Sequence, residues 1–426
     1  QGNTCHDNTI YGIAAAGQSL AIIGNVLSAN GTGVTGGAGI LANVSASLIA
    51  DNVITGNATY GIDSGGSQRI DLRGNTITGG RYGLNCGGSI AVRAENNAVQ
   101  DCTVAGICVA NVETDGAGVC FNQVTAQVSI AGNWIGMDGT AAGIWLRDGP
   151  QDVMVARNHF AGTSAIGNCL WADTDSVIVE ANRYNFAPRL TAGPTPLDPG
   201  QIVVPDIADH IALDPVASPV TRLVSARQAQ QSGKISFIRI TAPGTGYTAA
   251  TLAIGGGGQG ATAQAVISNG GLIGVVVLTA GSGYGAPGSR VPVSITGDGT
   301  GAAAIAWAAP PLPENRRLHL HCTATTTLQT GPTLQSWTGT SLTLPAGSDI
   351  TLTAIANTWH ATRIPAATHL SGPARLTTQG EPTGCTSLIG RGSPEGSIAA
   401  APGSDYRNLD RSEERRVGKE CLRLCR

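Results

Sequence analysis

The chain has 426 residues, a formal net charge of −3, 60 glycines and only 12% charged residues. Coiled coils and long helical bundles need far more charged and helix-forming residues than this, and no apolar run reaches the roughly 18 residues of a membrane-spanning helix. We therefore expect no membrane span, and because the body of the chain carries no basic stripe we also expect no nucleic-acid partner. The length is typical of two to four domains.

A repeat with a period of 22 to 27 residues occupies residues 1–187, with one longer interval near residues 110–126. An asparagine recurs with apolar residues mostly five and always three positions before it and two after it, at Asn25, Asn52, Asn75, Asn97, Asn133, Asn158 and Asn182. A Gly-Ile or Gly-Leu pair recurs at matching intervals from Gly12 to Gly143. Strand-like alternation inside so short a period predicts a solenoid of about seven coils with three short strands each. Leucine-rich repeats share the period, but their Leu-x-x-Leu-x-Leu consensus is absent.

The recurring asparagines are expected to have a structural role. A short amide side chain tolerates left-handed backbone at a corner. Stacked one coil above another, each amide can donate to the next, as in asparagine ladders of stacked strands. We therefore expect one continuous asparagine ladder along the solenoid.

This repeat resembles the pectin-lyase-like right-handed parallel β-helix superfamily, which includes polysaccharide lyases, glycoside hydrolases and phage tailspikes. The resemblance covers about 180 residues and rests on the repeat pattern. It implies an all-β fold, an extracellular, cell-surface or virion-associated location, and a polysaccharide or cell-surface glycan as partner. A tailspike of this type is compatible with a homotrimer. The catalytic signatures of polygalacturonases and pectate lyases are absent, so pectin is not indicated as the substrate.

The remaining chain divides by composition. We expect a Pro-rich linker at 188–233, with a short helix around Val220–Gln231, and then a glycine-rich β module at 234–310. In that module Pro243-Gly-Thr-Gly-Tyr247 recurs as Ala280-Gly-Ser-Gly-Tyr284, and its glycines are expected to form turns because no helical pattern follows them.

Three further segments complete the expected organisation: a small β domain at 311–364, a loose Pro/Gly/Ser-rich segment at 365–410 and a non-native tail at 411–426. The tail holds 9 charged residues in 16 and resembles an in-frame translation of a sequencing adapter. Because the chain begins in mid-pattern at Gln1, we also expect it to be a fragment.

Two tryptophans occupy the candidate site. Trp145 follows a Gly-Ile pair, and Trp171 holds the same position on the next coil, so alternation should turn both outward. The charged residues that follow them are Arg147, Asp148, Asp173 and Asp175. Exposed aromatic residues mark binding surfaces and suit the apolar faces of sugars, so we assign Trp145, Trp171, Arg147 and Asp148 to substrate binding. The alternative is that another segment or chain covers both indoles.

Asp173 and Asp175 are the candidate catalytic pair. Outward residues two apart on a strand are about 6.6–6.8 Å apart, within the roughly 6.5–9.5 Å that separates the carboxyl groups of inverting glycosidases. The structural alternative is that both are ordinary corner residues.

The leading hypothesis is therefore a β-helix protein that binds a surface polysaccharide. If the protein is an enzyme, it cleaves that polysaccharide by hydrolysis or elimination. The alternative is a non-catalytic structural or adhesive β-helix surface protein. No cofactor is expected, and no metal either, because His319 and His321 lack a third ligand.

Overall fold

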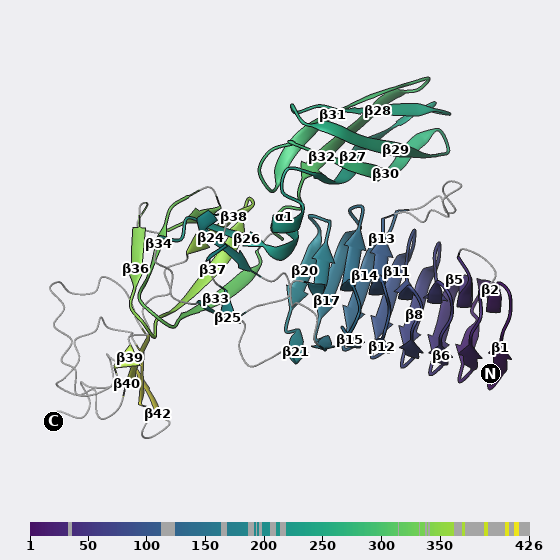
Figure 1. The fold of residues 1–426 in the computed structure, drawn as a ribbon, viewed down its shortest axis with the longest axis horizontal. Helices are drawn as coiled ribbons and strands as arrows, with labels where there is room; N and C mark the ends of the chain where they lie inside the picture. Colours follow the sequence, from purple (N-terminus) through teal and green to yellow (C-terminus); the bar gives the residue numbers. More distant parts are fainter. Residues whose placement is uncertain are drawn as a thin grey trace. The chain divides into compact units, whose positions relative to one another are not determined.

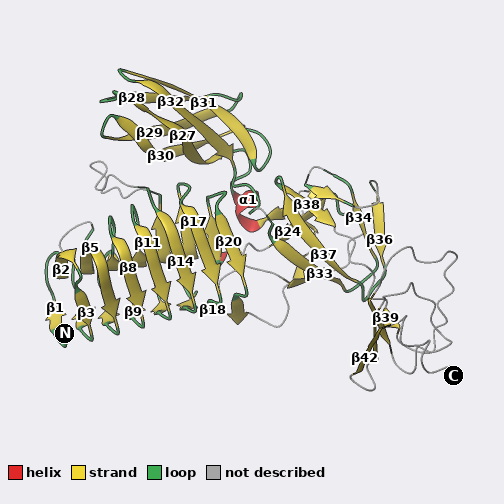
Figure 2. Ribbon diagram, turned by 180° about the vertical axis from the view of Figure 1, so that it is seen from behind, coloured by secondary structure: helices red, strands yellow, loops and turns green. Residues whose placement is uncertain are grey.

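The computed structural model describes residues 1–361 except 33–35, 112–123, 163–167, 186–190, 193, 196–197, 205–209, 214–218, 314, 332, 337–338 and 340, and beyond 361 only four short strands. Contacts divide the chain into two compact units, Gln1–His360 and Ala361–Arg426. The described residues are mainly β-strand, and α1 (Ala226–Gln230) is the only α-helix among them (Figure 2).

The N-terminal part of the chain is a parallel β-helix built from three rows of stacked strands (Figure 1). The first row is β1 (Thr4–His6), β4 (Val26–Ser28), β6 (Val53–Thr55), β9 (Thr76–Thr78), β12 (Ala98–Gln100), β15 (Trp134–Gly136), β18 (His159–Ala161) and β21 (Arg183–Asn185). The second row is β2 (Tyr11–Gln18), β5 (Ala38–Ala50), β7 (Tyr60–Asp63), β10 (Tyr82–Asn85), β13 (Ala105–Ala110), β16 (Ala142–Arg147) and β19 (Leu170–Ala172). The third row is β3 (Ala21–Ile23), the end of β5, β8 (Gln68–Arg73), β11 (Ile90–Glu95), β14 (Ala126–Ala131), β17 (Gln151–Ala156) and β20 (Val177–Glu180).

The asparagine ladder forms as the sequence predicts. The Asn75 side chain donates from Nδ2 to Oδ1 of Asn97 at 3.0 Å, and the Asn75 backbone N–H donates to the same oxygen at 3.0 Å. The ladder starts one coil earlier than expected, because Asn3 makes the equivalent pair of bonds to Asn25. The first row accordingly holds eight strands, one more than the seven coils predicted.

The prediction that the ladder asparagines themselves tolerate left-handed backbone was wrong in position. The left-handed residue is the one before each asparagine; Gly74, before Asn75, has φ 65° and Asn96, before Asn97, has φ 55°. The bend is made before the asparagine, so its side chain remains in line with those of the neighbouring coils and can form the ladder.

The apolar positions of the repeat form the core. Ile70, Leu72 and Ile77, from one coil, are fully buried. Ser47 takes the core position five before Asn52, and it is accommodated because its hydroxyl donates to Ser45 O at 2.8 Å and accepts from the Leu20 N–H at 3.0 Å. The inward set at five and three before and two after the asparagine is therefore confirmed on the inner coils, while Leu20 and Val179 on the end coils are half-buried against the same core. The side chain of Tyr184 lies outside the described residues.

The recurring glycine of the Gly-Ile pair is explained by close approach between coils. A Cβ at Gly83 would lie 2.3 Å from Cγ1 of Val99 and 2.6 Å from the carbonyl oxygen of Gly106, both on the next coil. Any side chain there would force neighbouring coils apart.

Residues 188–233, expected as a linker, contribute strands to sheets. β24 (Asp198–Val204) pairs with β26 (Arg222–Ser225) and with β23 (Pro194–Thr195), while β25 (His210–Leu213) pairs with β22 (Thr191–Ala192) and β33 (Arg317–Cys322). The expected short helix is present as α1, which begins after a capping box: Ser225 Oγ accepts from the Gln228 N–H, and Gln228 Oε1 accepts from the Ser225 N–H.

The glycine-rich module is a four-stranded antiparallel sheet with an additional hairpin. The sheet holds β27 (Ile235–Thr245), β32 (Thr300–Ala308), β31 (Ser289–Gly297) and β28 (Ala250–Ile254), and the hairpin holds β29 (Gln259–Ser268) and β30 (Gly271–Ser282). The two Gly-x-Gly-Tyr repeats have matching backbones, with φ 66° at Gly244 and 62° at Gly281, and each ends on a buried tyrosine. Gly244 and Gly281 lie within β27 and β30, so the prediction that the repeat glycines form turns was wrong for them. Only the second glycine of each repeat, Gly246 and Gly283, lies beyond the strand, with φ 77° and 78°.

The segment expected to form a small β domain at 311–364 contains six strands among its described residues. It contains β33 (Arg317–Cys322), β34 (Thr326–Gln329), β35 (Leu334–Gln335), β36 (Ser341–Leu344), β37 (Asp349–Ile355) and β38 (Thr358–Ala361). In the second unit the described strands are β39 (His369–Leu370), β40 (Ser387–Gly390), β41 (Asp405–Asn408) and β42 (Glu413–Arg416). β42 belongs to the tail and pairs with β41, while the rest of the tail lies outside the described residues.

Candidate functional site

Trp145 and Trp171 lie on adjacent coils, as their spacing predicts. They are register partners on β16 and β19, and both side chains are half-buried. Their ring centroids are 5.6 Å apart at an interplanar angle of 82°, the edge-to-face arrangement that aromatic pairs favour. The guanidinium of Arg147 lies 5.7 Å from the Trp145 ring and that of Arg227 lies 4.9 Å from the Trp171 ring.

Asp173 is directed into the protein and is only 2% exposed. Its two oxygens accept from Arg227 Nε at 2.7 Å, Arg227 Nη2 at 2.5 Å, Ser236 Oγ at 2.9 Å and Trp145 Nε1 at 3.2 Å. Arg227 comes from α1 and Ser236 from β27, so residues 54 and 63 positions further along the chain close over this carboxylate.

The expected strand geometry of the two candidate catalytic carboxylates does not occur. β19 ends at Ala172, so the chain no longer runs as a strand through Asp173 and Asp175. Asp175 instead forms an ion pair with Arg239 of β27. Both carboxylates are thus engaged by cations from the segment that follows the β-helix.

Arg147 and Asp148 form an ion pair with 2.8 Å between Nε and Oδ2. Burial opposes the charge of Arg147, but the Asp148 carboxylate outweighs it and holds the pKa of the guanidinium above its ordinary value. Burial raises the pKa of Asp148 despite the opposing charge of Arg147. Asp148 is 5% exposed, so it is not presented to solvent as a groove residue.

Two tyrosines extend the aromatic surface across earlier coils. Tyr60 on β7 and Tyr82 on β10 are register partners, and their rings stack with centroids 5.4 Å apart and an interplanar angle of 24°. Tyr82 packs with both tryptophans over the small buried residues Ala105, Cys108 and Ala142. We call Tyr60, Tyr82, Trp145 and Trp171 the aromatic face.

A buried carboxylate lies at the end of the strand that carries Tyr60. Asp63 is 8% exposed. It pairs in register with Asn85, Asn85 pairs with Cys108, and Cys108 pairs with Trp145, so Asp63 holds the position of Trp145 three coils earlier. Its Oδ1 accepts from Asn85 Nδ2 at 3.0 Å and from the Gly65 N–H at 3.1 Å. Burial raises the pKa of Asp63, against the effect of these two hydrogen bonds.

Sequence reasoning missed Tyr60 and Tyr82, although both directly precede a glycine of the Gly-Ile series and could have been found from that spacing. It could not find Arg227 or Ser236, because nothing in the local pattern links α1 and β27 to the corner after β19.

Comparison with known proteins identifies the class of fold. Residues 11–184 match the family model of the right-handed β-helix region. This part of the chain has the right-handed parallel β-helix fold. No curated protein matches the sequence.

Several solved structures are similar at low identity. They include DFA-IIIase from Arthrobacter chlorophenolicus A6 without its lid, at 16% identity and a TM-score of 0.25, covering 49% of this chain and 58% of that one. A tailspike protein mutant of E. coli bacteriophage HK620 in complex with a pentasaccharide has 13% identity and a TM-score of 0.27, with 72% and 68% covered. The Pseudomonas phage phi297 tailspike gp61 has 14% identity and a TM-score of 0.25, with 71% and 60% covered. Such scores carry no argument about activity.

Two further observations concern the described part of the chain. None of its helices is long and apolar enough to cross a membrane. It also contains no group of three or more His, Cys, Asp or Glu side chains arranged to hold a metal ion.

Proposed function

We propose that this protein binds a polysaccharide on the aromatic face of its β-helix. The location that we propose is extracellular or virion-associated, where polysaccharides are accessible. The observation that carries the proposal is the pair of aromatic contacts on the second row of strands, Tyr60 on Tyr82 and Trp145 against Trp171. Aromatic rings offer large, rigid contact area with little conformational entropy to lose, and the apolar faces of sugar rings pack against them.

Cations beside the rings support the same proposal. The Arg81 guanidinium lies 5.9 Å from the Tyr82 ring, and its side chain is exposed. Arg147 lies beside Trp145 and forms an ion pair with Asp148. Guanidinium groups offer several hydrogen-bond donors in a fixed geometry, which suits sugar hydroxyl and carboxylate groups.

The proposal is binding without cleavage by Asp173 or Asp175. A general acid or base must come within hydrogen-bond reach of the substrate proton, and Asp173 is buried with both oxygens already accepting. We therefore propose that these two carboxylates hold the segment after the β-helix in place. This favours an adhesive or recognition role over hydrolysis or elimination at this position.

The test is a panel of polysaccharides scored for both binding and release of reducing ends. For a glycan that binds, Trp145→Ala and Tyr82→Ala should each weaken affinity about tenfold or more, as for other lost aromatic anchors. Trp145→Phe should retain most of the affinity, because it keeps a ring while losing the hydrogen bond to Asp173.

Trp134 provides a matched control, since it is 37% exposed on β15 in a different row of strands. Trp134→Ala should leave affinity unchanged. An equal loss in Trp134→Ala, or unchanged affinity in the Trp145 and Tyr82 variants, would refute the aromatic face as the binding surface. Release of reducing ends by the wild type that Asp173→Asn abolishes, with folding intact, would refute binding without cleavage.

A further inference from the structure

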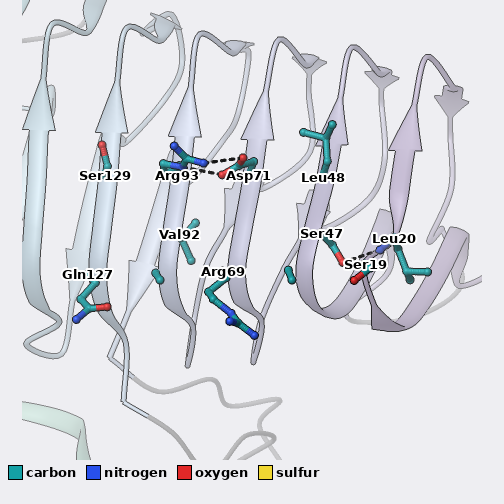
Figure 3. A pocket seen from close by; sticks show the side chains of 12 residues that line it. Ser19, Leu20, Ser47, Leu48, Arg69, Asp71, Val92, Arg93, Gln127 and Ser129 are labelled. Carbon is teal, nitrogen blue, oxygen red and sulfur yellow. Dashed lines mark hydrogen bonds and ion pairs between the residues drawn. The ribbon is translucent and has the colours of Figure 1, made fainter.

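A groove separate from the aromatic face lies on another row of strands. It has a volume of about 600 Å³ and runs across the third row, from Ser19 and Leu20, just before β3, over β5, β8 and β11 to β14 (Figure 3). Its polar residues are Ser19, Ser47, Arg69, Asp71, Arg93, Gln127 and Ser129. The aromatic face lies on β7, β10, β16 and β19 of the second row, so the groove and the aromatic face share no residue.

The groove follows a column of left-handed residues. Six successive coils place a non-glycine residue with φ between 49° and 57° at the same position, namely Ser19, Ala46, Arg69, Ala91, Gln127 and Asp152, and the first five of these line the groove. Left-handed backbone costs such residues roughly 1–2 kcal/mol each, and strained positions of this kind gather at functional sites. The left-handed column before the ladder asparagines uses glycine on several coils, as at Gly24 and Gly74.

Small neighbours leave space around one arginine. Arg69 is exposed, and the same position on the coils before and after it holds Ala46 and Ala91. The short alanine side chains leave the guanidinium accessible from the groove, with Gln127 one coil beyond Ala91 (Figure 3).

The charges of the groove do not balance. Arg93 and Asp71 neutralise each other through two hydrogen bonds, with 2.7 Å between Nε and Oδ1 and 2.9 Å between Nη2 and Oδ2. Among the residues that the structure describes, no carboxylate forms an ion pair with Arg69. One positive charge therefore remains for an anionic ligand group.

We propose that this groove binds an acidic oligosaccharide, with a sugar carboxylate on Arg69 and hydroxyl groups on Ser19, Gln127 and Ser129. Arginine binds a carboxylate through two parallel hydrogen bonds, while serine and glutamine side chains donate to and accept from hydroxyl groups. Five coils spaced about 4.8 Å apart give the groove a length of about 19 Å, enough for a short oligosaccharide. This site is additional to the aromatic face and does not depend on it.

The test measures binding of α-1,4-linked tetragalacturonate, of a sialic acid tetramer and of the neutral maltotetraose to the full chain by calorimetry. At least one acidic probe should bind at least tenfold more tightly than maltotetraose, and added salt should weaken it. Arg69→Ala should weaken that binding about tenfold or more, as expected for a lost charge-assisted hydrogen bond. Arg69→Lys should retain part of it.

Arg73 is the matched control, because it is exposed on the same strand but does not line the groove. Arg73→Ala and Trp145→Ala should both leave acidic binding unchanged, and the Arg69 and Arg73 variants, which change exposed side chains, should keep the wild-type melting temperature. The proposal is overturned if neither acidic probe binds at about 1 mM, if maltotetraose binds as tightly, or if Arg73→Ala loses as much affinity as Arg69→Ala. Loss in Trp145→Ala alone would instead assign the acidic probe to the aromatic face.

Discussion

Arg227 and Asp173 form a buried ion pair between residues 54 positions apart. The Arg227 side chain is 9% exposed and that of Asp173 is 3% exposed, and two hydrogen bonds of 2.7 and 2.5 Å join them. The same guanidinium lies over the Trp171 ring. The pair thus connects α1 to the last coils of the β-helix at the place where the sequence predicted a catalytic carboxylate.

Removing Arg227 should destabilise the protein strongly. Arg227→Ala leaves the Asp173 carboxylate buried without its cation, and breaking a buried pair in this way costs about 3–5 kcal/mol. Urea unfolding followed by tryptophan fluorescence should report the loss, because both nearby indoles change environment. Arg183→Ala, at an exposed arginine on β21, is the control and should have little effect. A loss below about 1 kcal/mol for Arg227→Ala would contradict the structural role of the pair.

The asparagine ladder should tolerate no gap in its middle. Asn75 Oδ1 accepts from the Asn52 backbone N–H at 3.1 Å and from Asn52 Nδ2 at 2.9 Å, all buried. Asn75→Ala leaves both donors unsatisfied, each at about 1–3 kcal/mol, so a loss of about 3 kcal/mol or more is expected from equilibrium unfolding. Asn182→Ala, at a half-buried site on the last coil, should cost less. Equal losses at the two sites would refute the importance of burial here.

The coils could be predicted because each repeats the same local physics. Alternating apolar residues such as Ile70 and Leu72, the ladder asparagine and the glycine that permits close approach recur at fixed spacing, so one coil determines the next. The left-handed residue before each asparagine was misplaced because that position varies between Gly74, Asn96 and Arg157, and no residue type marks it.

The site was predicted only in part, because some of the residues that form it lie far from Asp173 along the chain. Register placed Trp145 beside Trp171 correctly, since strand pairing propagates from coil to coil. The environment of Asp173 depends on Arg227 and Ser236, which belong to non-repeating segments. Periodicity carries no information about such contacts.

Acid should weaken the glycine-rich module through Asp298. Its carboxylate accepts hydrogen bonds from the side chain and backbone N–H of Thr248 and from the Ala249 N–H, which lower its pKa from 3.8 to about 2. A lowered pKa contributes stability above the unfolded value of 3.8, and this contribution is lost as pH falls through about 2. NMR titration should show the low pKa, and Thr248→Ala should raise it. An Asp298 carboxyl that titrates at its ordinary value would contradict the bonds.

Asp63 should have the opposite effect on pH dependence. Burial raises its pKa above 3.8, so below that pH the carboxyl is neutral in both folded and unfolded chains. As pH rises, the unfolded chain releases its proton first, and the folded state loses stability until pH passes the raised folded pKa. Above that folded pKa the cost is fully present.

Asp63→Asn should therefore stabilise the protein at about pH 7 and leave it unchanged below about pH 3.5. The variant keeps an oxygen that can accept from Asn85 Nδ2 and the Gly65 N–H, but it cannot ionise. Asp63→Ala is the matched control, because it removes the acceptor as well and should destabilise even in acid. Melting temperatures from about pH 3 to pH 8 measure both variants. If Asp63→Asn is less stable than the wild type near neutral pH, the carboxylate is favoured in its charged form, and a cation that stabilises it must be sought on this face of the β-helix.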